Sequence, residues 1–213
     1  MVINSSKTKT MIFNKSRKFD FTPNLTVSPT NENIDVVESF KLLGVMIRSD
    51  LSWTDNTKYI CSKGFARLWL LRRLKALGLT KDELLDVYMK QVRPVVELAV
   101  PAWQPGLSQL ESNQLERIQK CALHIILGED YTGYEAALEM TSCVSLEARR
   151  MQICEKFAVK TARSNKYSHW FVPNVRNTES RNTRHMTKYK PAITRTIRCE
   201  KSPIPFLTKI LNS

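Results

Sequence analysis

The sequence predicts an α+β fold that is mainly α: a short β segment, a small helical bundle and a basic, poorly ordered tail. Short apolar runs rich in β-branched and aromatic residues precede Trp53, and beyond it the apolar spacing changes to a period of about 3.6. After residue 163 no period is sustained, and polar and basic residues dominate. We therefore divide the chain into three domains, 1–53, 54–163 and 164–213.

The first segment contains two apolar runs, 9–13 and 40–47, which we expect to form buried strands. A weaker strand is expected at 24–27, and 28–33 has the composition of a turn. These few strands cannot enclose a core by themselves. We therefore expect a face or an edge of this segment to be covered by another part of a protein.

Helical periodicity in the second segment predicts four helices. The spacing places them at about 55–77, after Thr80, from Ser108 to Gly128, and at about 145–163. Thr80 with Glu83, and Ser108 with Glu111, form capping boxes, in which a hydroxyl and a glutamate satisfy the free amides of a helix start. Pro94 should end or kink the second helix, because it cannot donate a backbone hydrogen bond.

The formal net charge of +13 is concentrated at the end of the chain. Residues 161–213 hold 11 basic and 2 acidic side chains, whereas residues 54–160 hold 15 and 13. Counterion release favours such a tail on a phosphate backbone, without regard to base sequence. A solvated extension is the alternative interpretation of the same composition.

The sequence lacks the patterns that are typical of membrane-spanning proteins and of secreted, disulfide-rich proteins. No apolar run approaches the ~20 residues of a membrane span, and the first residues lack the apolar core of a signal peptide. Five widely separated cysteines do not suggest a disulfide framework. We expect an intracellular protein with no membrane partner, in either the cytoplasm or the nucleus.

No catalytic arrangement is visible in the sequence. The histidines and cysteines have no zinc-ligand spacing, and phosphate-loop and nucleophile-elbow motifs are missing. The adjacent acids 82–83 belong to the first turn of a helix, and 129–130 belong to a polar turn. We predict no catalytic residue, no metal site and no cofactor for this chain.

Several segments, taken in order, carry a family resemblance. They are 4–13, 40–45, 51–53, 88–94 with Trp103, 115–120, 146–150, and 202–205 with 211–212. Together they resemble the C-terminal part of the reverse transcriptase of non-LTR (LINE-type, jockey/CR1-like) retrotransposons. The resemblance extends over nearly the whole chain, with the segments in the family's order.

This resemblance implies that 1–53 is the end of a polymerase palm and that 54–163 is thumb-like. In that family an aromatic-x-Asp-Asp box, which binds Mg²⁺, precedes the segment matched by 4–13, and this sequence contains no such box. The chain would then be a truncated RNA-directed DNA polymerase without its N-terminal palm, its fingers and its catalytic carboxylates.

The resemblance also implies candidate contacts with a template–primer duplex of RNA and DNA. Lys7 and Lys9 match a region where a lysine stabilises the phosphates of the incoming nucleotide or donates a proton. A primer-grip-like hairpin covers 40–45. Its candidates are Phe40, Lys41 and Gly44, which forms the turn.

On the first bundle helix, Arg72, Arg73 and Lys75 are candidates for contacts with the duplex backbone. The alternative for all of these cations is a solvated strand edge or helix face.

Two functions therefore stay open. The first is a non-catalytic fragment of a retroelement polymerase that binds nucleic acid. The second is an autonomous or co-opted basic helical protein that binds nucleic acid without catalysis. A working enzyme is disfavoured, because the metal-binding carboxylates are missing from the sequence.

Overall fold

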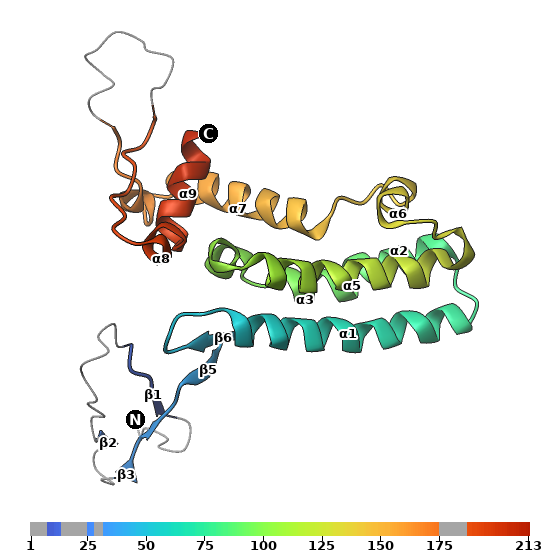
Figure 1. Ribbon diagram of the computed structural model, residues 1–213, viewed down its shortest axis with the longest axis horizontal. Helices are drawn as coiled ribbons and strands as arrows, with labels where there is room; N and C mark the ends of the chain where they lie inside the picture. The colour runs from blue at the N-terminus through green and yellow to red at the C-terminus, as the bar shows by residue number, and fades with distance from the viewer. Residues whose placement is uncertain (1–7, 14–24, 28–31, 175–186) are drawn as a thin grey trace. The chain divides into compact units, whose positions relative to one another are not determined.

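The computed structural model describes residues 8–13, 25–27, 32–174 and 187–213 (Figure 1). The chain divides into two compact units, Met1–Ile60 and Cys61–Ser213, which we call the strand unit and the helical unit. Helices predominate over short strands along the described chain, so the predicted mainly helical α+β class is confirmed.

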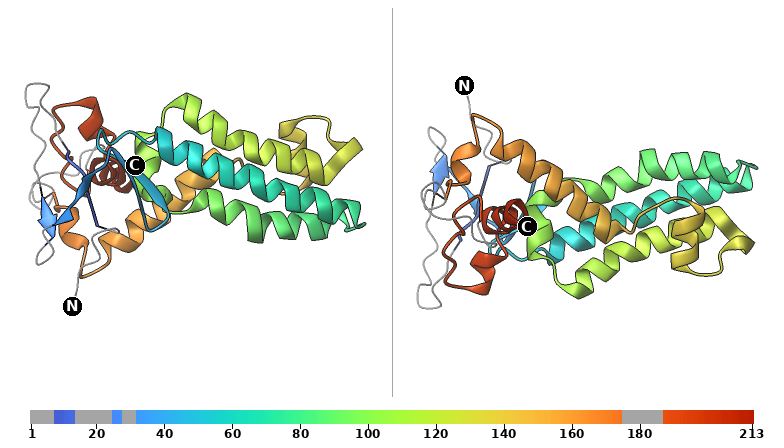
Figure 2. Two further views of the ribbon diagram at one scale, coloured as in Figure 1. Left: turned by 90° about the horizontal axis from the view of Figure 1, so that it is seen from below. Right: turned by 90° about the horizontal axis from the view of Figure 1, so that it is seen from above.

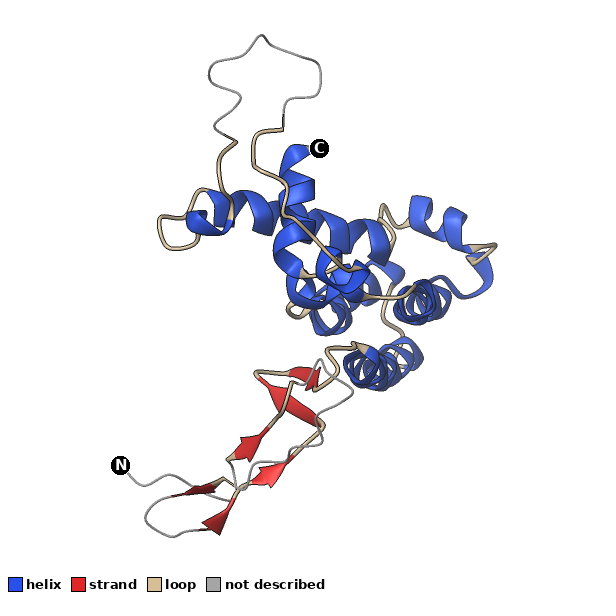
Figure 3. Cartoon of the chain, turned by 60° about the vertical axis from the view of Figure 1, so that its left-hand side comes forward, coloured by secondary structure: helices blue, strands red, loops and turns tan. Residues whose placement is uncertain are grey.

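In the strand unit, short strands pair two by two (Figure 3). The parallel pair is β1 (Lys9–Thr10) with β4 (Asp35–Val36), and the antiparallel pairs are β2 (Thr26–Val27) with β3 (Glu32–Asn33) and β5 (Ser39–Leu42) with β6 (Val45–Arg48). The weak strand expected at 24–27 is confirmed at its end. The run at 9–13 is a strand only over β1, and the run at 40–47 is a hairpin instead of one strand.

The prediction of buried strands is wrong. Among residues 8–13, 25–26 and 33–53, no side chain is buried, and Phe40 and Leu42 are exposed. The physical reason is that each sheet has two strands and no second layer to cover it.

Helices make up most of the helical unit, which α1 enters from the strand unit. The longer ones are α1 (Thr54–Ala76), α5 (Gln109–Leu127), α7 (Leu146–Ala162) and α9 (Pro203–Asn212). The shorter ones are α2 (Lys81–Val87), α3 (Arg93–Glu97), α4 (Val100–Trp103), α6 (Tyr134–Met140) and α8 (Ile197–Glu200). Single turns occur at η2 (Tyr88–Val92), η3 (Gln104–Gly106), η4 (Gly128–Asp130) and η5 (Ser168–Trp170).

Helix boundaries agree with the local signals of the sequence. Both capping boxes are present: Thr80 with Glu83 opens α2, and Ser108 with Glu111 opens α5. Before Pro94 the helix widens into the π-turn η2, in which the amide of Arg93 donates to the carbonyl of Tyr88. The regular α-helical pattern is thus interrupted just before Pro94, and α3 continues the chain from Arg93.

The core of the helical unit lies between α1, α2–α3, α5 and α7. In both views of Figure 2, α1, α2–α3 and α5 run alongside one another. Gly64 of α1 faces Ile118 of α5 so closely that a Cβ at residue 64 would lie 2.7 Å from Ile118 Cδ1. Leu68, Leu71 and Trp103 are completely buried in this core.

A polar cluster is also buried in the bundle. Arg150 of α7 is fully buried and donates to Gln104 Oε1 at 2.7 Å and to Ser112 Oγ at 2.6 Å. Burial lowers the pKa of this guanidinium, and the nearby Glu116 carboxylate opposes that shift. Glu116 in turn accepts the amides of Leu146 and Glu147 at 2.9 and 3.0 Å, so it caps the start of α7.

The expectation of a poorly ordered tail is wrong for its last residues. Pro203–Asn212 form α9, which packs against α7 and α4. Leu207 is almost completely buried, because α9 turns its apolar face toward those helices. Residues 175–186 of the predicted tail lie outside the described residues.

Candidate nucleic-acid interface

The β5–β6 hairpin turns through Leu43 and Gly44. Leu42 pairs with Val45, so the loop has two residues, whose φ angles are 48° and 90°. Turns of this kind need positive φ at both positions, which glycine adopts freely and a leucine does not. Leu43 is nevertheless 93% exposed, so a strained apolar side chain stands at the hairpin tip. The family resemblance predicts Gly44 at this turn but gives no sign of Leu43.

Polar bonds hold this hairpin against the start of α1 within the strand unit. The buried side chain of Asn56 accepts the Met46 amide at 3.1 Å. Arg48 pairs with Asp55 at 3.2 Å and with Asp50 at 3.1 Å. The Ser52 amide and then the Arg48 guanidinium lower the pKa of Asp50 to about 2. These bonds therefore fix the hairpin relative to the first turn of α1.

Two of the lysines predicted in the strand unit, Lys9 and Lys41, have partners inside the protein. Lys9 Nζ lies 2.5 Å from Asp35 Oδ2. Lys41 Nζ lies 4.7 Å from the centre of the Tyr59 ring, a cation–π distance. Lys7 lies outside the described residues. Asp35 thus neutralises the one described lysine of the segment resembling the nucleotide-binding region.

Lys9 and Phe40 come together at a small apolar cavity of about 170 Å³. The remaining lining residues are Met11, Phe13, Val37, Leu42 and Ile47. A cavity this apolar offers few groups that could hold a phosphate. Its residues instead form an incompletely covered apolar surface of the strand unit.

The outer face of α1 in the helical unit combines aromatic rings and guanidinium groups. Phe65, Trp69, Arg72 and Arg73 follow helical spacing beside the stripe of buried Leu68 and Leu71, and all four are exposed. Trp69 is 62% exposed, and the Arg73 guanidinium carbon lies 5.9 Å from the centre of its ring. Arg72 and Arg73 are both exposed. We call these four residues the α1 outer face.

Lys75, the third cation predicted on this helix, points to the other side. Its Nζ donates to the Ile125 carbonyl of α5 at 2.5 Å. Gly128 ends α5 with a φ of 64°, and a Cβ there would lie 2.7 Å from Lys75 Nζ. Lys75 therefore closes the C-terminal end of α5, where carbonyls lack helical partners and a cation is favoured.

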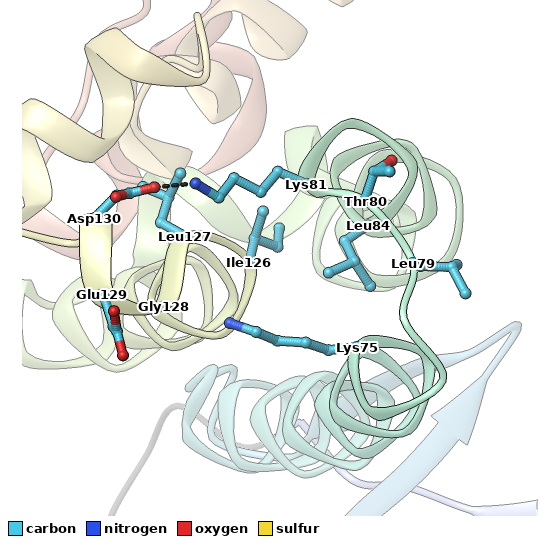
Figure 4. A pocket seen from close by; sticks show the side chains of 10 residues that line it. All are labelled: Lys75, Leu79, Thr80, Lys81, Leu84, Ile126, Leu127, Gly128, Glu129 and Asp130. Atoms are coloured by element: carbon cyan, nitrogen blue, oxygen red, sulfur yellow. Dashed lines mark hydrogen bonds and ion pairs between the residues drawn. The ribbon is translucent and has the colours of Figure 1, made fainter.

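An open pocket of about 680 Å³ lies beside this contact (Figure 4). Leucine and isoleucine side chains form its walls, and they come from α2, from the loop before α2 and from the end of α5. Figure 4 shows Lys81 reaching across to Asp130, its ion-pair partner, with Glu129 nearby. Because Lys75 and Lys81 already have partners and two carboxylates are present, this pocket is poorly suited to an anion.

Among the described residues, no three His, Cys, Asp or Glu side chains lie close enough together to hold a metal ion. None of the helices in the described part of the chain combines the length and apolar character of a membrane span. Comparison of the chain with protein-family models, curated proteins and solved structures yields no match.

Proposed function

We propose that this chain is a non-catalytic fragment of a non-LTR retroelement reverse transcriptase, comprising the end of the palm and a thumb-like helical unit, which binds a template–primer duplex. The ordered resemblance of its sequence segments to that family supports the assignment. The missing aromatic-x-Asp-Asp box supports binding without nucleotide transfer.

The observation that carries the binding function is the α1 outer face. Arg72 and Arg73 provide guanidinium groups that pair with phosphates, and Phe65 and Trp69 provide flat apolar surface beside them. Exposure of the Trp69 ring to water is unfavourable, which favours a partner that covers it with apolar surface. The neighbouring arginines favour a negatively charged partner, and a nucleic-acid groove offers both phosphates and apolar surface. This face lies on a helix of the bundle, which fixes the spacing of all four side chains.

The strand unit supports the fragment interpretation. It has exposed apolar side chains at Phe13, Phe40 and Leu42 and buries no described side chain before Asn56. Such a unit gains stability from a further layer of protein, as a palm would supply.

Primer extension tests the lack of catalysis. The chain is incubated with an RNA template, a DNA primer, deoxynucleotides and Mg²⁺ or Mn²⁺. The proposal expects a duplex gel shift without primer elongation. Elongation that depends on template sequence would contradict it.

An autonomous nucleic-acid-binding protein is the second candidate, and the completeness of the helical core favours it. Trp103 and Tyr88 are buried within the helical unit, and so are Leu68 and Leu71 of α1, Leu84 of α2, and Leu115 and Leu123 of α5. Sequencing the transcript upstream separates the candidates: an in-frame aromatic-x-Asp-Asp box supports the fragment, and a stop codon without such a box supports the autonomous protein.

A further inference from the structure

A second surface of the helical unit, far along the chain from α1, gathers aromatic and basic side chains. It consists of Lys166, Tyr167, His169 and Trp170 after α7, together with Lys188, Tyr189 and Lys190 (Figure 1, orange). We call these residues the post-α7 surface. The charge pattern of the sequence points to residues 161–213, which include this surface, but not to its aromatic side chains.

The aromatic rings of this surface lie next to one another. The centroids of Tyr167 and Trp170 are 5.1 Å apart, with their planes inclined by 50°, and His169 lies 6.3 Å from Trp170. Tyr167 and Trp170 are 37% and 36% exposed, so each presents part of a ring to solvent. The Lys166 ammonium lies 5.3 Å from the Tyr167 ring centre.

A buried anchor supports the exposed rings. Phe171, directly after Trp170, is 2% exposed and its ring centre lies 5.8 Å from that of Tyr189. Backbone bonds join the two segments: Lys190 donates to the Val172 carbonyl at 2.8 Å, and Asn174 donates to the Lys188 carbonyl at 3.2 Å. The second segment is thereby fixed beside the first.

Asn212 of α9 completes this support. Its carboxamide accepts the Tyr189 amide at 2.9 Å and donates to the Tyr189 carbonyl at 2.9 Å. Both polar groups of the Tyr189 backbone are therefore bound by one side chain. Because α9 packs on α7, the surface rests on two helices and is not a free tail.

The charge of this surface has one sign. Residues 163–174 and 187–199 contain basic side chains and no aspartate or glutamate. Arg163, Lys166, Lys188 and Lys190 are all exposed. Such a surface attracts phosphate groups.

We propose that the post-α7 surface binds single-stranded nucleic acid, with unpaired bases stacking on Trp170 and Tyr167 and the surrounding lysines contacting phosphates. Bases in a duplex are already stacked, whereas unpaired bases are free to pack against aromatic side chains. An acidic peptide would satisfy the lysines but would leave the exposed ring faces without flat partners.

This inference is independent of the proposed function, because it involves none of the residues of the α1 outer face. The two can fail separately: loss of duplex binding in α1 variants concerns the first, and binding of an unpaired strand concerns the second.

The test measures fluorescence anisotropy of a labelled 12-nucleotide oligo(dT) with the full chain, against an abasic oligonucleotide of equal length and charge. The abasic strand retains the phosphates and lacks the bases. The proposal expects it to bind at least about tenfold more weakly, since stacking makes a large contribution to such complexes. Equal binding of both strands, or no binding of oligo(dT), would overturn the proposal.

Variants of the full chain assign the effect to this surface. Trp170→Ala should weaken oligo(dT) binding about tenfold, and Trp170→Phe, which retains a ring, much less. Phe157→Ala removes an equally exposed aromatic of α7 and serves as the matched control. Thermal unfolding of each variant verifies folding. If Trp170→Ala and Phe157→Ala bind oligo(dT) equally well, the assignment to this surface is refuted.

Discussion

The Arg150 guanidinium donates from Nη2 to the Ser112 hydroxyl at 2.6 Å, and no part of the arginine side chain reaches solvent. The same group binds Gln104 and lies 3.9 Å from the carboxylate of Glu116, which caps α7. One buried cation thus connects α5, α7 and η3. Both Glu116 and Arg150 belong to segments that carry the family resemblance, and in this protein they have a structural role.

We expect Arg150→Met to lower the free energy of unfolding by about 3–5 kcal/mol, because it leaves Ser112, Gln104 and Glu116 without their partner. Arg149→Met is the matched control. Arg149 is half-buried and pairs with Glu97 at 3.0 Å, so its loss should cost about 1 kcal/mol or less. Urea denaturation followed by circular dichroism measures both. Equal losses would show that the buried cluster contributes no more than this half-buried ion pair.

The contact between Gly64 and Ile118 predicts a loss of stability from an added methyl group. Alanine gains up to about 1 kcal/mol of helix propensity over glycine, but its Cβ would overlap Ile118, and overpacking costs about 1–3 kcal/mol. Gly64→Ala should therefore be net destabilising in thermal unfolding. Ile118→Val removes the overlapping Cδ1 atom. The loss of unfolding free energy in the double variant should therefore be smaller than the sum of the losses in the two single variants. Strict additivity would exclude a direct clash.

The positive φ of Leu43 predicts that a substitution at the hairpin tip can stabilise the protein. Asparagine tolerates positive φ better than leucine, so Leu43→Asn should stabilise the β5–β6 hairpin by about 1 kcal/mol. Amide exchange of β5 and β6 measured by NMR should slow accordingly. Leu42→Asn is the control, because Leu42 is also exposed and lies in the strand, where no positive φ is relieved. Faster exchange in Leu43→Asn would mean that the leucine side chain itself holds the hairpin.

The low pKa of Asp50 predicts that the stability of the turn after β6 depends on pH. Its pKa of about 2 is below the ordinary 3.8, so its ionised form stabilises the folded turn above pH ~4. That contribution is lost as the pH falls from about 4 to 2. An NMR titration of the carboxyl carbon should give a midpoint near 2, and Arg48→Ala should raise it only in part, because the Ser52 amide still donates. A midpoint near 3.8 in the unchanged protein would contradict these bonds.

Local signals in the sequence predicted much of the bundle. The starts of α2 and α5 follow from hydroxyl and glutamate residues three positions apart, a pattern that depends on one turn of chain alone. The interruption before Pro94 follows from the missing amide of proline. The hairpin turn at Gly44 was likewise assigned from its own segment, although through the family resemblance.

Features that depend on distant residues were not predictable in this way. Lys75 looked like a free cation of α1, but the end of α5 binds it across 50 positions of sequence. α9 forms because α7 and α4 provide an apolar surface for Leu207, and the composition of the tail contains no sign of that surface. The burial of Arg150 also arises from packing between helices.

The central claim, that the α1 outer face binds a nucleic-acid backbone, is tested most directly by the salt dependence of duplex binding. Anisotropy of a labelled RNA–DNA hybrid is measured from low to moderate salt for the unchanged chain, Arg72→Ala and Arg117→Ala. Arg117 is an equally basic, exposed residue of α5, so its substitution changes the net charge by the same amount. We predict that Arg72→Ala reduces the slope of log affinity against log salt by about 1, whereas Arg117→Ala leaves it unchanged. Equal slopes for all three proteins would contradict the claim.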